Sequence, residues 1–203
     1  MNRPGVAYKA MAGPGELLGA TLDGVGASGV ASVRAVVATL GRVDADGDLT
    51  LPGYFGRQDV QVVPVHNWEH VPIGKGQVYE QGDQAIADLK VNLAIPQARA
   101  WWEAFKFDLE HPPALQQFSY GYTVKTGGTF EGRFGGRKVR FLQPLKDGSP
   151  GAVLHEVSPV LLGAGVSTGL LEVSAPAAAS GPDPDEIAAR EFARYVRNTL
   201  EAA

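Results

Sequence analysis

The residues best suited to acid–base chemistry are histidines that lie close to carboxylates in the sequence. Two of the four histidines, His66 and His70, belong to the segment PVHNWEHVPIG, and a third, His155, is followed directly by Glu156 in VLHEVSPV. A neutral imidazole can take a proton from a nucleophile, and a carboxylate can hold the imidazole in the tautomer that does so. Pairs of histidines can also bind a metal ion. These segments are therefore candidates for general-base catalysis or for a zinc site.

The zinc alternative rests on HNWEH at residues 66–70, which fits the pattern H-x-x-E-H. In proteins that use this pattern, both histidines bind zinc from one face of an α-helix and the glutamate acts as base. Pro64 and Pro72 bracket the motif and Gly74 follows, which leaves too little room for a stable helix. A zinc hydrolase is therefore the less favoured hypothesis, and for either histidine alone a partly exposed loop position is the simpler explanation.

A nucleophile in this chain must be a hydroxyl, an amine or a carboxylate, because the sequence contains no cysteine. Ser119 in QQFSYGY is one candidate, because it lies between aromatic residues on an expected strand and Gly121 allows close approach by a substrate. The alternative is a strand serine that bonds to a neighbour, and the local sequence favours that alternative. Because a triad is defined by geometry and not by chain order, the choice depends on the elements that position these side chains.

Those elements are predicted to be mostly β-strands, with one or two helices. Apolar or alternating runs bounded by turn residues are typical of strands, and a polar QGDQ turn between two such runs predicts a hairpin. The expected strands lie at residues 33–43, 60–65, 76–82, 85–93, 116–124 and 137–145, with further apolar segments at 152–162 and 169–173.

One internal helix is expected at about residues 96–110. Pro96 suits a first helical turn, and Pro112 and Pro113 follow the helix and end it. The apolar side chains that share one face are Ala98, Trp101, Trp102, Phe105 and Leu109.

Two loop segments resemble ligand-binding loops but lack the required residues. DADGD at 44–48 has carboxylates at alternate positions, yet Leu49 and Phe55 stand where a calcium loop needs glycine and glutamate. We interpret it as a solvated hairpin turn. The glycine-rich stretch at 127–136 has no phosphate-loop lysine, so flexibility is its better explanation.

Glycine and proline together supply about a fifth of the 203 residues, and they divide the chain into three parts. Residues 1–30 are rich in Gly and Ala and are expected to form a flexible N-terminal arm. Residues 31–175 carry the patterned core of a single domain, and residues 176–203 form a linker followed by a charged amphipathic helix.

Charge and hydropathy exclude further classes of protein. The net charge is -4, whereas dedicated nucleic-acid binders usually carry a basic field, so no direct nucleic-acid binding is expected. No apolar run approaches the roughly 18 residues needed to cross a bilayer, and the N-terminus lacks the apolar region of a signal peptide. We therefore expect a soluble, intracellular protein without a membrane partner.

Taken together and in order, the segments resemble the prohead (capsid maturation) protease family of tailed bacteriophages. The similarity covers roughly residues 32–162. It rests on His66 followed by Asn67 and a P-I-G segment at 72–74, then S-Y-G-Y at 119–122, and then E-V-S-P-V at 156–160. No single piece is specific, but three pieces in order with plausible spacing are.

The resemblance implies a fold and a site. The family is related in fold to the herpesvirus assemblin proteases, so the expected fold is β-rich α+β, with a closed antiparallel β-barrel and surrounding helices. By resemblance, Ser119 would be the nucleophile, His66 the general base and Glu156 the group that orients the imidazole. His155 competes for the third role, and because neighbouring strand residues point to opposite faces, only one of the pair can face the site. Backbone amides at Gly163 or Gly165 would form the oxyanion hole.

The resemblance also implies partners and a location. Such a serine endopeptidase would work in the host cytoplasm inside the assembling procapsid, where it would cut scaffold or the scaffold-like region of the major capsid protein, and itself. A homodimer is expected, with no cofactor and no metal. The alternative from another class is a catalytically inactive assembly or scaffolding factor on the same fold.

Overall fold

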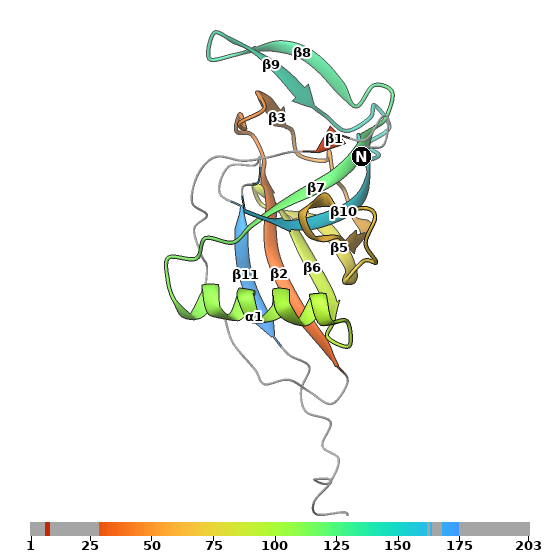
Figure 1. The fold of residues 1–203 in the computed structure, drawn as a ribbon. Helices are drawn as coiled ribbons and strands as arrows, with labels where there is room; N and C mark the ends of the chain where they lie inside the picture. The colour runs from red at the N-terminus through yellow and green to blue at the C-terminus, as the bar shows by residue number, and fades with distance from the viewer. Residues whose placement is uncertain (1–6, 9–28, 162, 164–167, 175–203) are drawn as a thin grey trace, which may run out of the picture.

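The computed structural model describes residues 7–8, 29–161, 163 and 168–174, and β-strands are its dominant element (Figure 1). In chain order the elements are β1 (Ala7–Tyr8), β2 (Val30–Thr39), β3 (Asp48–Thr50), β4 (Gln58–Val62), the 3-10 helix η1 (Pro64–His66), β5 (Gly74–Gln81), β6 (Gln84–Asn92), α1 (Pro96–Glu110), β7 (Gln117–Val124), β8 (Thr129–Phe134), β9 (Arg137–Leu142), β10 (Ala152–Val160) and β11 (Gly169–Ser174).

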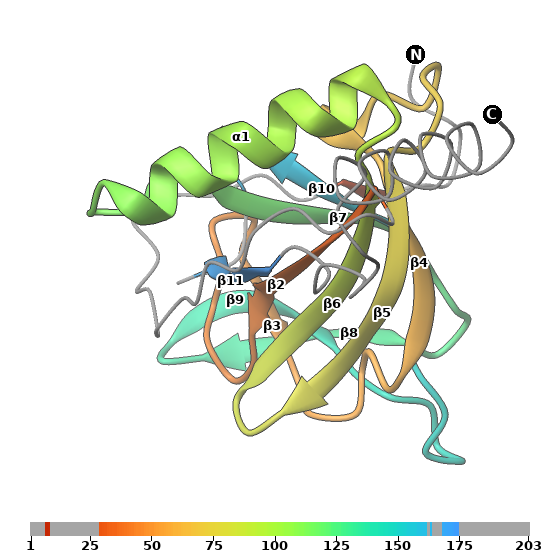
Figure 2. The same cartoon turned by 90° about the horizontal axis from the view of Figure 1, so that it is seen from below.

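The strands form two sheets. The larger has eight strands in the order β1-β7-β10-β4-β5-β6-β2-β11, and the smaller has three in the order β3-β9-β8. The larger sheet curls into an open half-barrel, as the views along and across its strands show (Figures 1 and 2). Most of the buried apolar residues form one cluster, to which strands of both sheets and α1 contribute.

The expected closed antiparallel barrel is wrong, although the expectation of a β-rich fold is confirmed. In the described part of the chain β1 pairs only with β7 and β11 only with β2, so the two ends of the large sheet are not joined. Two pairings are also parallel, β10 with β4 and β3 with β9. The alternation of apolar and polar residues shows which face of a strand is buried, but it does not encode the direction of a distant partner strand.

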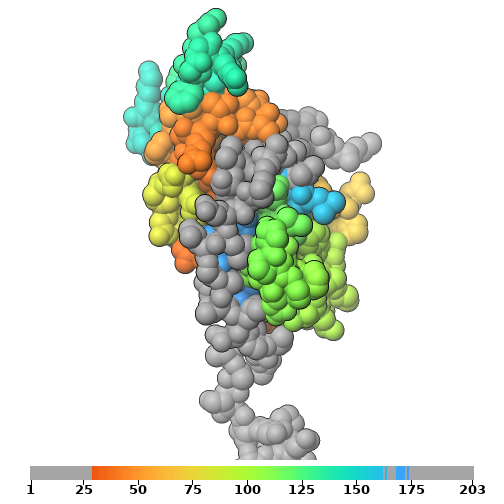
Figure 3. Space-filling model, turned by 90° about the vertical axis from the view of Figure 1, so that its left-hand side faces the viewer, coloured from red at the N-terminus to blue at the C-terminus, as the bar shows by residue number. Residues whose placement is uncertain are grey.

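The expected helix is confirmed as α1, with Ala98, Trp102 and Phe105 buried against the core. It lies across one end of the half-barrel, whereas the β8–β9 hairpin projects at the other end (Figures 1 and 3). Within the residues that the structure describes, α1 is the only α-helix, so the expectation of surrounding helices has no support. No helix in this part of the chain is long and apolar enough to span a membrane.

The hairpin around QGDQ is confirmed as β5 and β6, but two loop expectations need correction. The glycine-rich stretch is not simply a flexible loop, because residues 129–134 form β8 and pair with β9. The DADGD turn is not fully solvated, because Asp48 is buried and its carboxylate accepts hydrogen bonds from the Arg140 guanidinium.

The tails fall mostly outside the described residues. Of the expected arm at 1–30, Ala7 and Tyr8 form β1 and pair with β7. The linker and helix expected at 176–203 lie outside the described residues, as does most of the arm.

Strand β7 positions the candidate site because its side chains alternate between two environments. Phe118, Tyr120 and Tyr122 are buried in the core, so Ser119 and Gly121 face the other side of the sheet. The start of this strand is tied to α1, because the Asp108 carboxylate accepts hydrogen bonds from the backbone N–H groups of residues 115 and 116.

Candidate active site

The register of β7 against β10 gathers the sequence-predicted residues on one face. In this antiparallel pair Ser119 lies opposite Ser158, and Gly121 lies opposite Glu156. Oε1 of Glu156 lies against Gly121, so the carboxylate covers the glycine on the face away from the core. Ser119 and Glu156 therefore share a face of neighbouring strands, although they are far apart in sequence.

His66 reaches this face from the turn that follows β4. Strand β4 runs parallel to β10, and the Val63 N–H donates to the carbonyl of Val157 at 3.1 Å, which anchors the start of the turn. Val65 and His66 then adopt left-handed backbone conformations, with φ of 50° and 55°. Such a conformation costs a residue with a Cβ about 1–2 kcal/mol, so neighbouring contacts must hold the turn.

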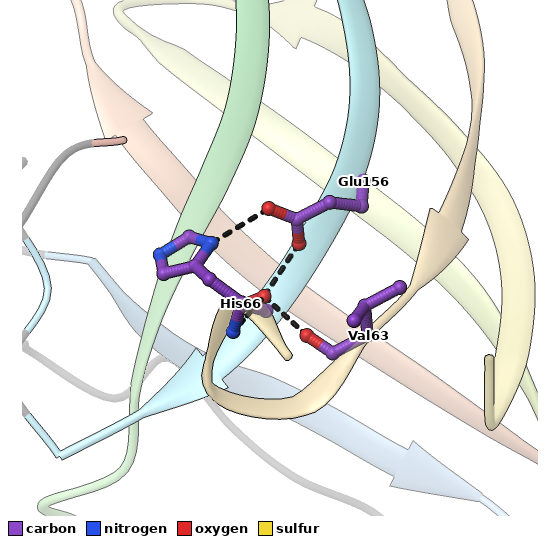
Figure 4. A network of polar contacts seen from close by, with 4 residues as sticks. Val63, His66 and Glu156 are labelled. Atoms are coloured by element: carbon purple, nitrogen blue, oxygen red, sulfur yellow. Dashed lines mark hydrogen bonds and ion pairs between the residues drawn. The ribbon is translucent and has the colours of Figure 1, made fainter. Parts of the chain in front are cut away.

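The imidazole of His66 and the carboxylate of Glu156 are in direct contact. Nδ1 of His66 lies 2.6 Å from Oε1 of Glu156, and the second ring nitrogen lies on the far side of the ring (Figure 4). The Glu156 side chain is completely buried, whereas that of His66 is 20% exposed. An acceptor at Nδ1 favours the tautomer that carries its proton there, which leaves Nε2 able to accept a proton.

Ser158 links this pair to the turn, and sequence reasoning did not single it out as a functional residue. Its hydroxyl contacts the second carboxylate oxygen of Glu156 and the carbonyl of Val63, and it accepts a hydrogen bond from the His66 N–H at 3.1 Å (Figure 4). A hydroxyl has one proton, so Ser158 can donate to only one of these two acceptors at a time. The position of Ser158 two residues after Glu156 on a strand was the available signal, because such residues share a face.

His155 has a different set of contacts. A β-bulge between Leu154 and Glu156 makes His155 the additional residue of β10. Its Nε2 lies 2.8 Å from the Thr123 hydroxyl, and its ring packs edge-on against Trp68, which also lies over Gly121. Thr123 and Gly121 share a face of β7, so the bulge places His155 and Glu156 on the same face and corrects the expectation that they point to opposite ones.

Ser119 is only 1% exposed. A peptide can therefore reach its hydroxyl only after the groups that cover it move aside. The site must therefore open before Ser119 can contact a substrate.

Of the two glycines expected at the oxyanion hole, the structure describes only Gly163. The Gly163 N–H donates to the side-chain oxygen of Gln117 at 2.8 Å, so that amide already has an acceptor. Gly165 lies outside the described residues.

The H-x-x-E-H segment does not form an α-helix. After η1 it continues as turns, and His70 is exposed on the wall of a surface cavity of about 840 Å³ that Trp68 and His155 also line. Across the residues that the structure describes, no three His, Asp or Glu side chains are grouped so that they could hold a metal ion. Nδ1 of His66 contacts the Glu156 carboxylate.

Comparison with known proteins identifies no relative: no family model matches the chain, and searches of curated proteins and solved structures return no match. Inference about function therefore rests on the motifs and on the geometry of the site.

Proposed function

We propose that the protein is a serine endopeptidase of phage procapsid maturation. The observation that carries the proposal is the contact between His66 and Glu156 on the face that also holds Ser119. By resemblance to the prohead proteases, its substrates are scaffold or the scaffold-like region of the major capsid protein, and the enzyme itself. It acts in the host cytoplasm inside the assembling procapsid.

In the first half of the reaction, Ser119 Oγ attacks the carbonyl carbon of the scissile peptide bond. Nε2 of His66 takes the hydroxyl proton, and Glu156 stabilises the imidazolium through the Nδ1–H. His66 then gives the proton to the leaving amine, and the C–N bond breaks to leave an acyl-enzyme on Ser119.

In the second half, water takes the place of the amine. His66 accepts a proton from the water as it attacks the ester, and it returns that proton to Ser119 as the carboxylic acid leaves. The negative oxygen of each tetrahedral intermediate needs backbone N–H donors. For Gly163 to serve as one, its amide must first exchange the Gln117 side chain for the oxyanion.

A fluorophosphonate probe tests the proposal without a known substrate, because it reacts covalently with activated serines. We expect labelling of the full chain at Ser119, mapped by mass spectrometry, and loss of labelling in Ser119→Ala. The matched control is Ser149→Ala, since the hydroxyl of Ser149 bonds only locally to Asp147 in the described structure. Labelling that survives Ser119→Ala would refute the assignment.

Co-expression with the cognate capsid protein tests the substrate. We expect the capsid or scaffold protein to be shortened by the unaltered enzyme and by Ser149→Ala, but not by Ser119→Ala. The deep burial of Ser119 favours a second candidate, an inactive assembly factor on the same fold. That candidate predicts neither labelling nor shortening by the unaltered, folded protein.

A further inference from the structure

In the described part of the chain, one edge of strand β7 pairs with β10 along its length, and the two residues of β1 pair with the opposite edge. The Val63 N–H donates to the carbonyl of Val157, so the backbone polar groups of Val157 point toward β4. Its neighbours on β10 must therefore point toward β7. Their partners Ser119 and Gly121 point back toward β10.

The remaining backbone groups of β7 point to the opposite edge. Because successive strand residues direct their N–H and C=O groups to alternate sides, Phe118, Tyr120 and Tyr122 face away from β10. Two contacts agree with this geometry. The Phe118 carbonyl accepts a hydrogen bond from the Thr168 hydroxyl, and Tyr122 is the register partner of Ala7 in β1.

This edge lies beside the candidate nucleophile. Ser119 is flanked on β7 by Phe118 and Tyr120, whose backbone groups face the edge. Strand β1 is antiparallel to β7, with Ala7 opposite Tyr122 and Tyr8 opposite Gly121. A chain continued in this register would place its next two residues beside Tyr120 and Ser119.

We propose that the edge of β7 from Tyr120 to Tyr122 is the docking site for the extended peptide that the enzyme cuts, and that Ala7–Tyr8 occupies it in cis. This inference rests on the proposed function for the identity of the bound peptide. The chain itself supplies the evidence that the edge accepts an extended segment by strand addition, in which main-chain hydrogen bonds provide the affinity. The N-terminal segment and the substrate then compete for one edge.

The test measures peptide binding in a background that cannot cut. The protein is the full chain carrying Ser119→Ala, and the probe is a fluorescein-labelled peptide with the sequence of residues 4–12, PGVAYKAMA. In a second protein, Ala7→Pro and Tyr8→Pro are added, because proline cannot donate to a ladder and should vacate the edge. The matched control carries Ala20→Pro and Thr21→Pro in the same arm, away from the paired residues.

Fluorescence anisotropy measures the affinity for the peptide. We expect the protein that carries Ala7→Pro and Tyr8→Pro to bind about tenfold more tightly than the control, because the peptide no longer competes with a pair of hydrogen bonds made by the N-terminal segment. A peptide that carries the same two substitutions, Ala7→Pro and Tyr8→Pro, should not bind. Hydrogen exchange should show that the peptide protects the amides of Tyr120 and Tyr122. Equal affinity of the two proteins, binding of the proline peptide, or protection elsewhere would overturn the inference.

The outcomes separate this inference from the proposed function. If the peptide binds as expected but the fluorophosphonate does not label Ser119, the edge is a peptide-binding site and the protease assignment fails. If Ser119 is labelled but the two proteins bind the peptide equally, the protease assignment stands and the docking edge is wrong.

Discussion

The carboxylate of Glu156 occupies the space that a side chain at Gly121 would fill. A Cβ built on Gly121 lies 2.5 Å from Oε1 of Glu156 and 3.2 Å from Cζ2 of Trp68. The absence of a side chain at position 121 therefore allows Glu156 to remain in contact with His66. In the S-x-G-Y segment, the glycine has a steric role in the site in addition to any role in substrate approach.

Gly121→Ala should displace the Glu156 carboxylate. We expect a loss of about 1–3 kcal/mol in the free energy of unfolding, as for other insertions into packed sites, and a large drop in the rate of Ser119 labelling. The control is Gly132→Ala on β8, where the nearest atoms belong to the rings of Phe141 and Phe130. It should leave the labelling rate unchanged. Unchanged labelling in Gly121→Ala would show that the carboxylate position does not matter to reactivity.

Glu156→Gln tests which residue orients the imidazole of His66. The amide keeps the size of the carboxylate but cannot stabilise an imidazolium, so we expect the rate of Ser119 labelling to fall by roughly 10³–10⁴-fold. His155→Gln should lower it far less, because His155 contacts Thr123 and Trp68. Glu69→Gln, an exposed carboxylate in the same loop as His66, is the control for loss of charge. The opposite ranking of the substitutions at 155 and 156 would make His155 the third member of the triad.

Ser158→Ala should destabilise the protein because it removes one hydroxyl that serves three buried or partly buried partners. The Val63 carbonyl, the His66 N–H and the second oxygen of Glu156 would each lose a contact. We expect a loss of about 2–3 kcal/mol, measured as a lower urea midpoint at an unchanged slope. Ser149→Ala should shift the midpoint by no more than about 0.5 kcal/mol. A similar shift in both variants would mean that waters or neighbours replace the Ser158 contacts.

Val65→Asn should stabilise the protein. Val65 has φ of 50°, which a β-branched residue adopts only under strain and asparagine tolerates, and its side chain is 52% exposed. We expect a gain of about 1 kcal/mol in the free energy of unfolding. Val71→Asn is the matched control, because Val71 is 71% exposed and lies outside the left-handed region. If Val65→Asn destabilises the protein while the control does not, the Val65 side chain makes a contact worth more than the strain.

The sequence could predict the elements whose patterns are local. The helix beginning at Pro96 and the hairpin of β5 and β6 have their periodicity and turn residues in one continuous stretch. The parallel pairing of β10 with β4 could not be predicted, because it joins residues about 95 positions apart, Glu156 with Gln61. The openness of the sheet and the contact between His66 and Glu156 depend on that pairing, so local sequence patterns could not predict them either.

The candidate site divides in the same way. The order of three short motifs predicts Ser119, His66 and Glu156 as site residues, and the structure brings His66 and Glu156 into contact. The bulge at His155 and the left-handed turn at Val65 depend on tertiary contacts, and the residue types at these positions do not predict them. Such features are set by packing, which overrides local preferences.

Arg140→Met tests the ion pair between Arg140 and the buried Asp48, which belongs to the turn that the sequence predicts to be solvated. Nε and Nη2 of Arg140 donate to the two oxygens of Asp48 at 2.7 and 2.5 Å, and Asp48 is 1% exposed. Removing the guanidinium leaves a buried carboxylate without this partner, so we expect a loss of about 2–4 kcal/mol in the free energy of unfolding. Arg137→Met, an exposed position on the same strand, should cost no more than about 0.5 kcal/mol.

The pH dependence of this loss follows from the direction of the pKa shift. The hydrogen bond to Asp48 raises the pKa of Arg140 above its ordinary value. A cation with a raised pKa contributes its full stabilisation below the pKa of the unfolded state, and loses it only as pH rises through the pKa of the folded state. Arginine is protonated in both states at pH 6 to 10. The difference between Arg140→Met and the unaltered protein, measured by urea unfolding at pH 6, 8 and 10, should therefore stay constant, and a difference that shrinks toward pH 10 would contradict a guanidinium held in this pair.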